Sequence, residues 1–323
     1  MDVAREAGVS HATVSLALRE HASIPQKTRE RIKEIAERLG YAPDPMLAGL
    51  AAYRMSQRPA AYRSNIAWVY NFPSAVGGDF GEYYKSASKR AKELGFNLEV
   101  IHMADIDYNP KRLEQILDAK GITGLLLPPC PLFGGELRID FSRFSAVRFG
   151  YSYRYPMLHT VVNAQFHTAY TAFQKVMEAG YQRIGFMSSK DLDQRTAWGF
   201  LGGITTGQKL LAKANRIEPY YLDDAQGYGG IGDWIRRERI DAVIGLGAWA
   251  SVRDSGLDVG YADLGVSTVD RHVTGMDQNA PRIGIAAVEF LTSMMHRAET
   301  GIPDEPTYLC VQSRWVEGET LCR

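Results

Sequence analysis

From residue 64 onward, short apolar runs alternate with amphipathic stretches, and this alternation constrains the fold more than any other feature. The runs have the length of buried strands and the stretches between them have the length of helices. They include IAWVY (66–70), LEVIHM (98–103), HTVVN (159–163) and DAVIGLG (241–247). This order is typical of parallel sheets built from βαβ units. Because the pattern covers about 260 residues, which is large for one domain, it predicts an α/β body of two lobes with helices flanking parallel sheets.

The first 40 residues have a different pattern, that of short all-α elements. Gly8 separates a first helix, about residues 2–7, from a second helix that Ser10 can cap. On a helical wheel, the second helix has an inward face made of Val14, Ala17 and Leu18.

A third helix follows Pro25 and ends at Gly40. Apolar residues recur along it with helical spacing, which predicts a core stripe of Ile32, Ile35, Ala36 and Leu39. Three short helices with a glycine in the first turn predict a helix-turn-helix unit.

Hydroxyl side chains are concentrated around the second helix, at Ser10, Thr13 and Ser15. A helix in the major groove of DNA brings its N-terminal amides and short hydroxyls against phosphates. We therefore expect these hydroxyls to contact phosphate oxygens, with Arg19 and Thr28 extending the contact. The alternative at this point is a plain helical bundle, in which Ser10 only caps the helix and Thr13 only bonds to its backbone.

The charge of this neutral chain is distributed unevenly. Residues 1–63 contain ten Lys and Arg against seven Asp and Glu, a net charge of +3, which leaves 27 against 30, or −3, for the remainder. A basic N-terminal region fits an anionic partner.

Several protein classes are disfavoured by composition. No apolar run approaches the roughly 18 residues of a membrane span, and the N-terminus lacks the apolar segment of a signal peptide. The three cysteines form neither a C-x-x-C pair nor a zinc pattern. We therefore expect a cytoplasmic protein that has no structural metal and no membrane partner.

Two N-terminal segments, DVAREAGVSHATVSLALRE and IPQKTRERIKEIAERLGYAPDP, resemble the headpiece of the LacI/GalR family of bacterial transcriptional regulators. The resemblance continues through the body in KRLEQILDAKGITGLLLPP, EAGYQRIGFMSS and GMDQNAPRIGIAAVEFL. It implies a homodimeric repressor that binds double-stranded operator DNA and has a periplasmic-binding-protein-like body. It also implies that a small-molecule effector, a sugar or related metabolite, binds between the two lobes and controls operator affinity.

By this resemblance the second headpiece helix is the recognition helix, and His11, Ala12 and Leu16 occupy its base-reading positions. Many relatives carry arginine where this chain has Leu16. Leucine cannot donate a hydrogen bond to guanine, but it can pack against the methyl group of thymine. The operator sequence of a relative therefore does not transfer to this chain.

A segment rich in Pro, Ala and Arg joins the headpiece to the body. Asp44 and Pro45 can cap a short helix, MLAGLAAYR, which Gly49 weakens. A helix of this length is unstable alone. The resemblance implies a hinge helix that orders with its dimer mate on DNA, with Leu50 as a wedge in the minor groove. The alternative is a plain linker.

Ligands of open α/β bodies bind at the carboxyl ends of the strands. Residues in such positions are Asn71, Tyr151, Asp270 and Gln278, and the resemblance places effector contacts at or beside them. Asp270 is the residue that we most expect to accept hydrogen bonds from sugar hydroxyls. For each residue, the alternative is an ordinary polar position in a loop.

Two departures from the family pattern affect this site. Relatives often carry arginine where this chain has Thr196, and Arg195 lies beside it. Relatives also tend to have an Asn-Asp pair where this chain has Trp249 and the two residues before it. Trp249 suits the apolar face of a sugar or a planar ligand, and it suits a core equally well. We include Arg195 and Trp249 as candidate contacts, and the identity of the effector does not transfer.

An enzyme and a sugar-transport protein are the alternative classes. GYGGIG (227–232) fits the dinucleotide fingerprint G-x-G-x-x-G, but it is separated from the preceding strand, and a surface loop is the better interpretation. No G-x-S-x-G, P-loop or histidine-rich metal spacing occurs. The headpiece and the missing signal peptide disfavour a transport protein. We therefore predict a regulator that is not an enzyme and needs no cofactor.

These patterns predict three regions. They are the headpiece at 1–43, the hinge helix and linker at 44–63, and the effector-binding and dimerisation body at 64–323. Within the body, the expected lobes are 64–163 with 278–305, and 164–277 with 306–323.

Overall fold

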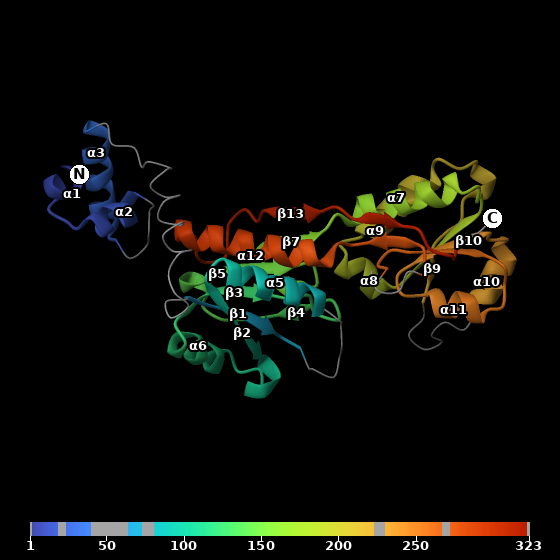
Figure 1. The fold of residues 1–323 in the computed structure, drawn as a ribbon, viewed down its shortest axis with the longest axis horizontal. Helices are drawn as coiled ribbons and strands as arrows, with labels where there is room; N and C mark the ends of the chain where they lie inside the picture. Colours follow the sequence, from blue (N-terminus) through green and yellow to red (C-terminus); the bar gives the residue numbers. More distant parts are fainter. Residues whose placement is uncertain are drawn as a thin grey trace.

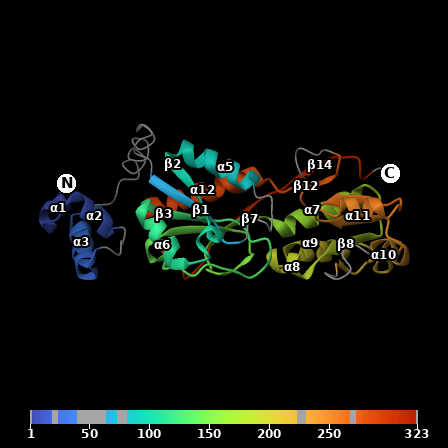
Figure 2. The same ribbon diagram turned by 90° about the horizontal axis from the view of Figure 1, so that it is seen from below.

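The structure is a computed structural model that describes residues 2–18, 24–39, 64–72, 81–222, 230–266 and 272–321. Figures 1 and 2 show a small helical headpiece at one end of an elongated molecule, followed by two α/β lobes in a row. The predicted N-terminal helices and the predicted body of parallel sheets flanked by helices are both confirmed. Of the helices in these ranges, none is both long and apolar enough to cross a membrane.

The headpiece consists of α1 (Asp2–Ala7), α2 (His11–Leu18) and α3 (Gln26–Arg38). Most of the predicted inward residues are buried in one small core, which contains Val14, Ala17, Ile32, Ile35 and Ala36. The prediction was wrong for Leu39, which is 42% exposed. Since α3 ends at Arg38, Leu39 lies past the last turn and does not continue the buried stripe. The predicted helix end, Gly40, lies outside the described residues.

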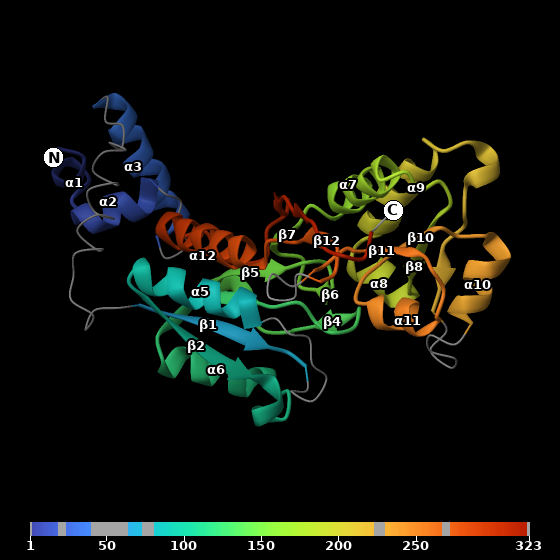
Figure 3. The ribbon, with the colours of Figure 1, turned by 45° about the vertical axis from the view of Figure 1, so that its right-hand side comes forward.

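The sheet of the first lobe has the strand order β13-β7-β5-β3-β1-β2, with every pairing parallel. Helices α5 (Gly81–Glu93) and α12 (Ala280–Arg297) pack together on one face, and α6 (Pro110–Ala119) lies on the other (Figure 3). The strands are β1 (Ser64–Tyr70), β2 (Phe96–His102), β3 (Ile122–Leu127), β5 (Ser145–Phe149), β7 (His159–Asn163) and β13 (Tyr308–Val311). Two short strands, β4 (Gly135–Glu136) and β6 (Tyr153–Tyr155), pair beside this sheet.

The sheet of the second lobe has the order β14-β12-β11-β10-β8-β9, in which only the β12–β14 pairing is antiparallel. Its strands are β8 (Ile184–Ser188), β9 (Tyr220–Tyr221), β10 (Ala242–Gly245), β11 (Gly260–Asp263), β12 (Gly275–Asp277) and β14 (Arg314–Val316). Its helices are α7 (Gln165–Glu178), α8 (Lys190–Arg195), α9 (Gly199–Gln208), α10 (Ile231–Glu238) and α11 (Trp249–Asp254).

Strand β10 shows why both faces of the second sheet need helices. Ala242 and Ile244 point into the core under α7 and α9, whereas Val243 points into the core under α10 and α11. Successive strand residues face opposite sides, so a strand that is apolar at every position must be covered on both.

One expected lobe boundary differs from the structure. Residues 306–323 were expected in the second lobe, but β13 pairs in parallel with β7 of the first sheet and only β14 joins the second sheet. Pairing with β13 satisfies backbone groups along the outer edge of β7, which would otherwise lack partners. The chain therefore crosses between the lobes in the two residues 312–313.

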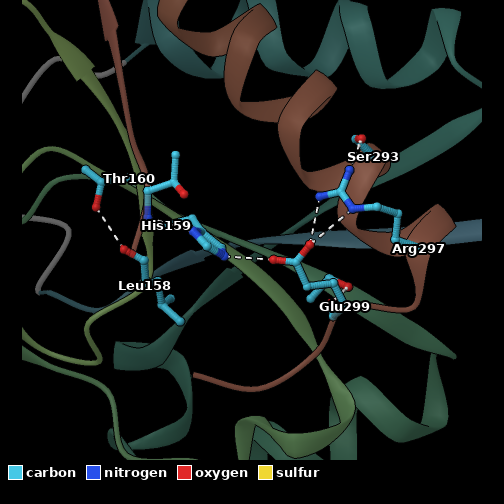
Figure 4. Close-up of polar contacts among 8 residues, drawn as sticks. Leu158, His159, Thr160, Ser293, Arg297 and Glu299 are labelled. Atoms are coloured by element: carbon cyan, nitrogen blue, oxygen red, sulfur yellow. Dashed lines mark hydrogen bonds and ion pairs between the residues drawn. The ribbon is translucent and has the colours of Figure 1, made fainter. Parts of the chain in front are cut away.

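A polar network fixes the segment that follows α12 to the start of β7 (Figure 4). Nε2 of His159 lies 2.8 Å from Oε1 of Glu299, and Nδ1 of His159 accepts a hydrogen bond of 2.9 Å from the amide of Thr307. This pattern places the imidazole proton on Nε2, which donates to the carboxylate. Arg297 Nη2 donates to the second oxygen of Glu299 over 2.7 Å.

Candidate functional site

Helix α2 packs against the other two helices of the headpiece. Val14 and Ala17 of α2 are buried against the other two helices. Arg31 of α3 donates a hydrogen bond of 2.6 Å to the carbonyl of Ala7, where α1 ends. Arg38 and Glu6 form an ion pair between the same two helices. These contacts fix the angle between the helices, as a helix-turn-helix unit requires.

Ser10 and Thr13 are linked to each other at the start of α2. Ser10 Oγ accepts a hydrogen bond of 3.1 Å from the Thr13 amide, so Ser10 caps the helix as predicted. The two hydroxyl oxygens are 2.9 Å apart and hydrogen-bonded. Ser10 is exposed and Thr13 is half-buried, so the cap lies at the surface.

For the other predicted DNA contacts, the structure describes the backbone position of some residues and leaves two residues undescribed. The backbone of His11, Ala12, Ser15 and Leu16 lies within α2. Thr28 lies in the first turn of α3, is half-buried, and donates its amide to the carbonyl of Pro25 over 2.9 Å. Arg19 and Leu50 lie outside the described residues.

A pocket lies between the two lobes at the carboxyl ends of their strands. It measures about 170 Å³ and brings together three predicted residues, Tyr151, Arg195 and Gln278. The first lobe contributes most of the aromatic surface, and both lobes contribute polar side chains, among them Asn163 and Arg195. Its other lining residues are Tyr83, Pro129, Phe149, Gly150, Ser152, Val161, Val162, Asn163, Gln165, Leu192, Thr196, Phe200, Leu246 and Ile283.

The remaining predicted effector residues do not join this pocket in the described structure. Asn71 Nδ2 donates a hydrogen bond of 2.6 Å to the carbonyl of Glu136. Trp249 packs against Tyr261, with ring centroids 5.6 Å apart, and lines a separate cavity of the second lobe. Asp270 lies outside the described residues.

Arg195 is held by a carboxylate that also reaches the other lobe. Its Nε donates a hydrogen bond of 2.6 Å to Oδ2 of Asp191, one turn earlier on α8. Oδ1 of Asp191 accepts a hydrogen bond of 2.7 Å from the amide of Phe133, which belongs to the first lobe. The hydroxyl of Thr196 instead donates to the carbonyl of Leu192 over 2.7 Å. Among the described residues, the Thr196 hydroxyl is therefore bonded within its own helix, whereas Nη1 and Nη2 of Arg195 have no hydrogen-bond partner.

Tyr151 and Arg148 are two ionisable residues on the first-lobe side of the pocket, and burial affects the pKa of both. Burial raises the pKa of Tyr151 and lowers the pKa of Arg148, because burial disfavours the charged form of each group. Arg148 is 2% exposed and donates to Thr160 Oγ1 over 2.9 Å and to the carbonyl of Tyr153 over 3.0 Å. The charge of Arg148 also interacts with the hydroxyls of Tyr308 and Tyr151.

Asn163 is a lining residue that the sequence analysis missed. It ends β7, and its Nδ2 donates to Ser313 Oγ over 2.7 Å while its Oδ1 accepts from Thr168 Oγ1 over 2.8 Å. These bonds join β7, α7 and the last crossover between the lobes. Asn163 ends the run HTVVN, so the strand-end rule would have found it if applied to every strand.

The structure describes only the second half of the GYGGIG stretch, which was interpreted as a surface loop. Gly230 has φ of 95° and immediately precedes α10, which begins at Ile231. Residues 227–229 lie outside the described ranges. A backbone with positive φ is favourable for glycine, which accounts for this glycine as the start of a helix.

Comparisons with known proteins agree with the headpiece and with the fold. Residues 1–44 match the family model described as bacterial regulatory proteins, lacI family. The regulator RegA of Clostridium saccharobutylicum is 24% identical over 333 residues, which cover 95% of each protein. DegA of Bacillus subtilis is 31% identical over 128 residues, which cover 39% of this chain and 34% of DegA.

Two solved structures share the whole architecture. The regulator CelR in complex with cellobiose has a TM-score of 0.59 at 19% identity, covering 98% of both chains. The lac repressor dimer bound to operator and the anti-inducer ONPF has a TM-score of 0.57 at 16% identity, covering 100% of this chain and 98% of that one. At such identities the likeness concerns the fold. The match to the lacI family model covers residues 1–44, and the chain as a whole shares the fold of these two regulators.

Proposed function

We propose that this protein is a sequence-specific transcriptional repressor whose operator affinity is controlled by a small molecule bound between its lobes. The observation that carries the proposal is one chain with both a helix-turn-helix headpiece and a two-lobed body that has a pocket between its lobes. The relatives are named as regulators rather than as enzymes, which supports a role without catalysis. A cytoplasmic location follows from the proposal, since the operator lies there.

In this proposal α2 lies in the major groove of the operator. His11, Ala12 and Leu16 read bases, and the phosphate contacts come from Ser10, Thr13, Ser15, Arg19 and Thr28. Two copies of the chain bind together, and Leu50 of each hinge enters the minor groove. The lac repressor dimer on its operator, which shares this fold, supports the arrangement.

The effector in this proposal is a carbohydrate. Tyr151 offers an aromatic face, Gln278 and Arg195 offer polar groups from the same pocket, and Asp270 belongs to the proposed contact set. The complex of CelR with cellobiose supports a sugar for a protein of this fold. An effector changes DNA affinity only to the extent that it binds one lobe arrangement more tightly than the other.

Selection of bound sequences from a random DNA library tests the DNA-binding part. We expect one enriched operator, bound more weakly as salt rises because phosphate contacts release counterions. Leu16→Ala should relax the preference at one base position by roughly 1 kcal/mol, whereas Thr13→Ala should weaken all sequences alike. Equal binding at 50 mM and 300 mM salt, or no enriched sequence, would contradict the proposal.

A further inference from the structure

We propose that the ligand of the cleft carries an acidic group, a carboxylate or a phosphate, which binds the two terminal nitrogens of Arg195. This inference rests on the proposed effector function and narrows its ligand class from carbohydrates in general to acidic carbohydrates.

The charge of the pocket wall is the first observation. Of the lining residues that the structure describes, Arg195 is the one with a formal charge, and no carboxylate lines the cavity in those ranges. The other polar groups are amides and hydroxyls, including Asn163, Gln165 and Gln278. A described wall with one cation and no anion favours a ligand that brings the opposite charge.

The geometry of Arg195 is the second observation. Its side chain is 27% exposed, and Nε is fixed by the 2.6 Å bond to Asp191. Within the described ranges, Nη1 and Nη2 have no hydrogen-bond partner. A guanidinium presents paired N–H groups that match carboxylate or phosphate oxygens, so fixing one nitrogen orients the other two for such a ligand.

Arg148 adds a second positive charge next to the pocket. It is almost completely buried, and among the described residues no carboxylate pairs with it. It interacts with the hydroxyl of Tyr151, which lines the pocket. Among the described residues, the charges of Arg148, Arg195 and Asp191 sum to +1, and Asp270 lies outside these residues. A buried cation without a carboxylate stabilises an anion placed close by.

Asp191 connects this anion site to the position of the lobes. The same carboxylate orients Arg195 in the second lobe and accepts the Phe133 amide from the first lobe over 2.7 Å. An anion on Nη1 and Nη2 lies beside this carboxylate and shares the guanidinium with it. The ligand would therefore bind next to the hydrogen bond that joins Asp191 to the first lobe.

Calorimetric titration of the full chain with matched sugars tests the proposal. The probes are glucose, glucuronate and glucose 6-phosphate, and the pair galactose and galacturonate, each also tested for its effect on operator affinity. We expect an acidic member to bind at least about tenfold more tightly than its neutral partner. Comparison of glucuronate with glucose 6-phosphate distinguishes a carboxylate from a phosphate.

Variants of Arg195 assign the effect to this residue. Arg195→Gln should weaken the acidic sugar by about ten- to a hundredfold, and Arg195→Lys by less, because lysine keeps the charge without the paired N–H groups. The matched control is Arg236→Gln, which removes an exposed arginine of α10 that pairs with Asp233 and does not line the pocket. We expect this control to bind like the wild type.

Two outcomes would overturn the inference and leave the proposed function in place. One is a neutral sugar that binds as tightly as its acidic partners and alters operator affinity. The other is an Arg195→Gln protein that binds the acidic sugar as the wild type does. If no sugar of either kind binds or alters operator affinity, both the inference and the carbohydrate proposal are wrong. If Arg195→Gln does not fold, Arg195→Lys decides, since unchanged acidic and neutral affinities there also overturn the inference.

Discussion

The hydrophobic cores of the headpiece and the body differ in the number and the size of the side chains that they bury. In the described part of the headpiece the core has eight buried residues, and four of them are alanines. The body instead buries large side chains in clusters on both faces of each sheet, among them Trp68, Phe149, Phe173 and Phe186. Apolar stabilisation scales with the area buried, so each headpiece residue gains less of it than a body residue does.

This difference suggests how the molecule divides its tasks. Domains of about 40 residues bury a small fraction of their surface and are marginally stable. At roughly 0.05–0.15 kcal/mol per residue, the headpiece has about 2–6 kcal/mol of stability and the body several times more. We therefore expect the headpiece to unfold first, while the body stays folded.

The largest expected effect comes from Ile32→Ala in the headpiece. Ile32 is completely buried, and truncation of such a residue costs about 2–5 kcal/mol, which is close to the total stability of the headpiece. We expect operator binding to be lost while calorimetric unfolding of the body is unchanged.

Leu291→Ala in α12 is the matched change in the body, since Leu291 is also completely buried. It should lower the unfolding temperature of the body and leave a folded protein that still binds the operator. If Ile32→Ala bound the operator like the wild type, or if both variants lost the body transition, the contrast between the two cores would be wrong.

A second, smaller effect is expected where two helices of the body approach closely. A side chain on Gly203 of α9 would collide with the Phe166 carbonyl and lie 2.8 Å from the Tyr170 amide, both in the backbone of α7. Gly203→Ala should therefore destabilise the second lobe by about 1–3 kcal/mol. At Gly8, the glycine in the described part of the headpiece, a side chain would meet no atom within 4 Å.

Gly202→Ala is the control, because a side chain there meets only the ring of Phe166 at 3.4 Å. Alanine also favours a helix more than glycine does, so this variant should unfold at the same temperature or slightly higher. Chemical denaturation of both variants measures the difference. Equal losses for the two would show that the backbone contact does not limit the packing of α7 on α9.

The smallest effect concerns the network at Glu299. Burial alone would raise the pKa of this carboxyl, but hydrogen bonds from Arg297 and His159 outweigh burial and hold the pKa below its usual value. A lowered folded-state pKa stabilises the fold above the unfolded pKa of about 4.3 and loses that contribution as pH falls through the folded value. Because the Glu299 side chain is 37% exposed, we expect less than about 1 kcal/mol.

Thermal unfolding of the wild type and of Glu299→Gln between about pH 6 and pH 3 measures this contribution. The wild type should be the more stable at pH 6, and the gap should shrink as pH falls. A gap that widens on acidification would mean that the network stabilises the protonated carboxyl instead.

Much of the architecture was predictable because it depends on local periodicity. The apolar runs became the strands and the amphipathic stretches became the helices, and Val14, Ala17 and Ile32 are buried as their spacing indicated. The candidate site was predictable in part, since Tyr151, Arg195 and Gln278 line one pocket. The rule that ligands bind at the carboxyl ends of strands identifies an edge of the sheet. It does not predict which side chains at that edge form hydrogen bonds with a neighbouring segment instead. Asn71 is such a residue, because its side-chain amide donates a hydrogen bond to the Glu136 carbonyl.

By itself, the sequence determined the N-terminal helix-turn-helix unit, its match to the lacI family model over residues 1–44, and the two-lobed α/β class of the body. Tertiary structure alone decided that β13 and β14 separate into different sheets, and that Asp191 joins Arg195 to an amide 58 residues earlier in the chain. The physical reason is the separation along the sequence between the groups that interact. Periodicity and caps act over a few residues, whereas edge pairing and ion pairing depend on which distant groups packing brings within hydrogen-bond distance.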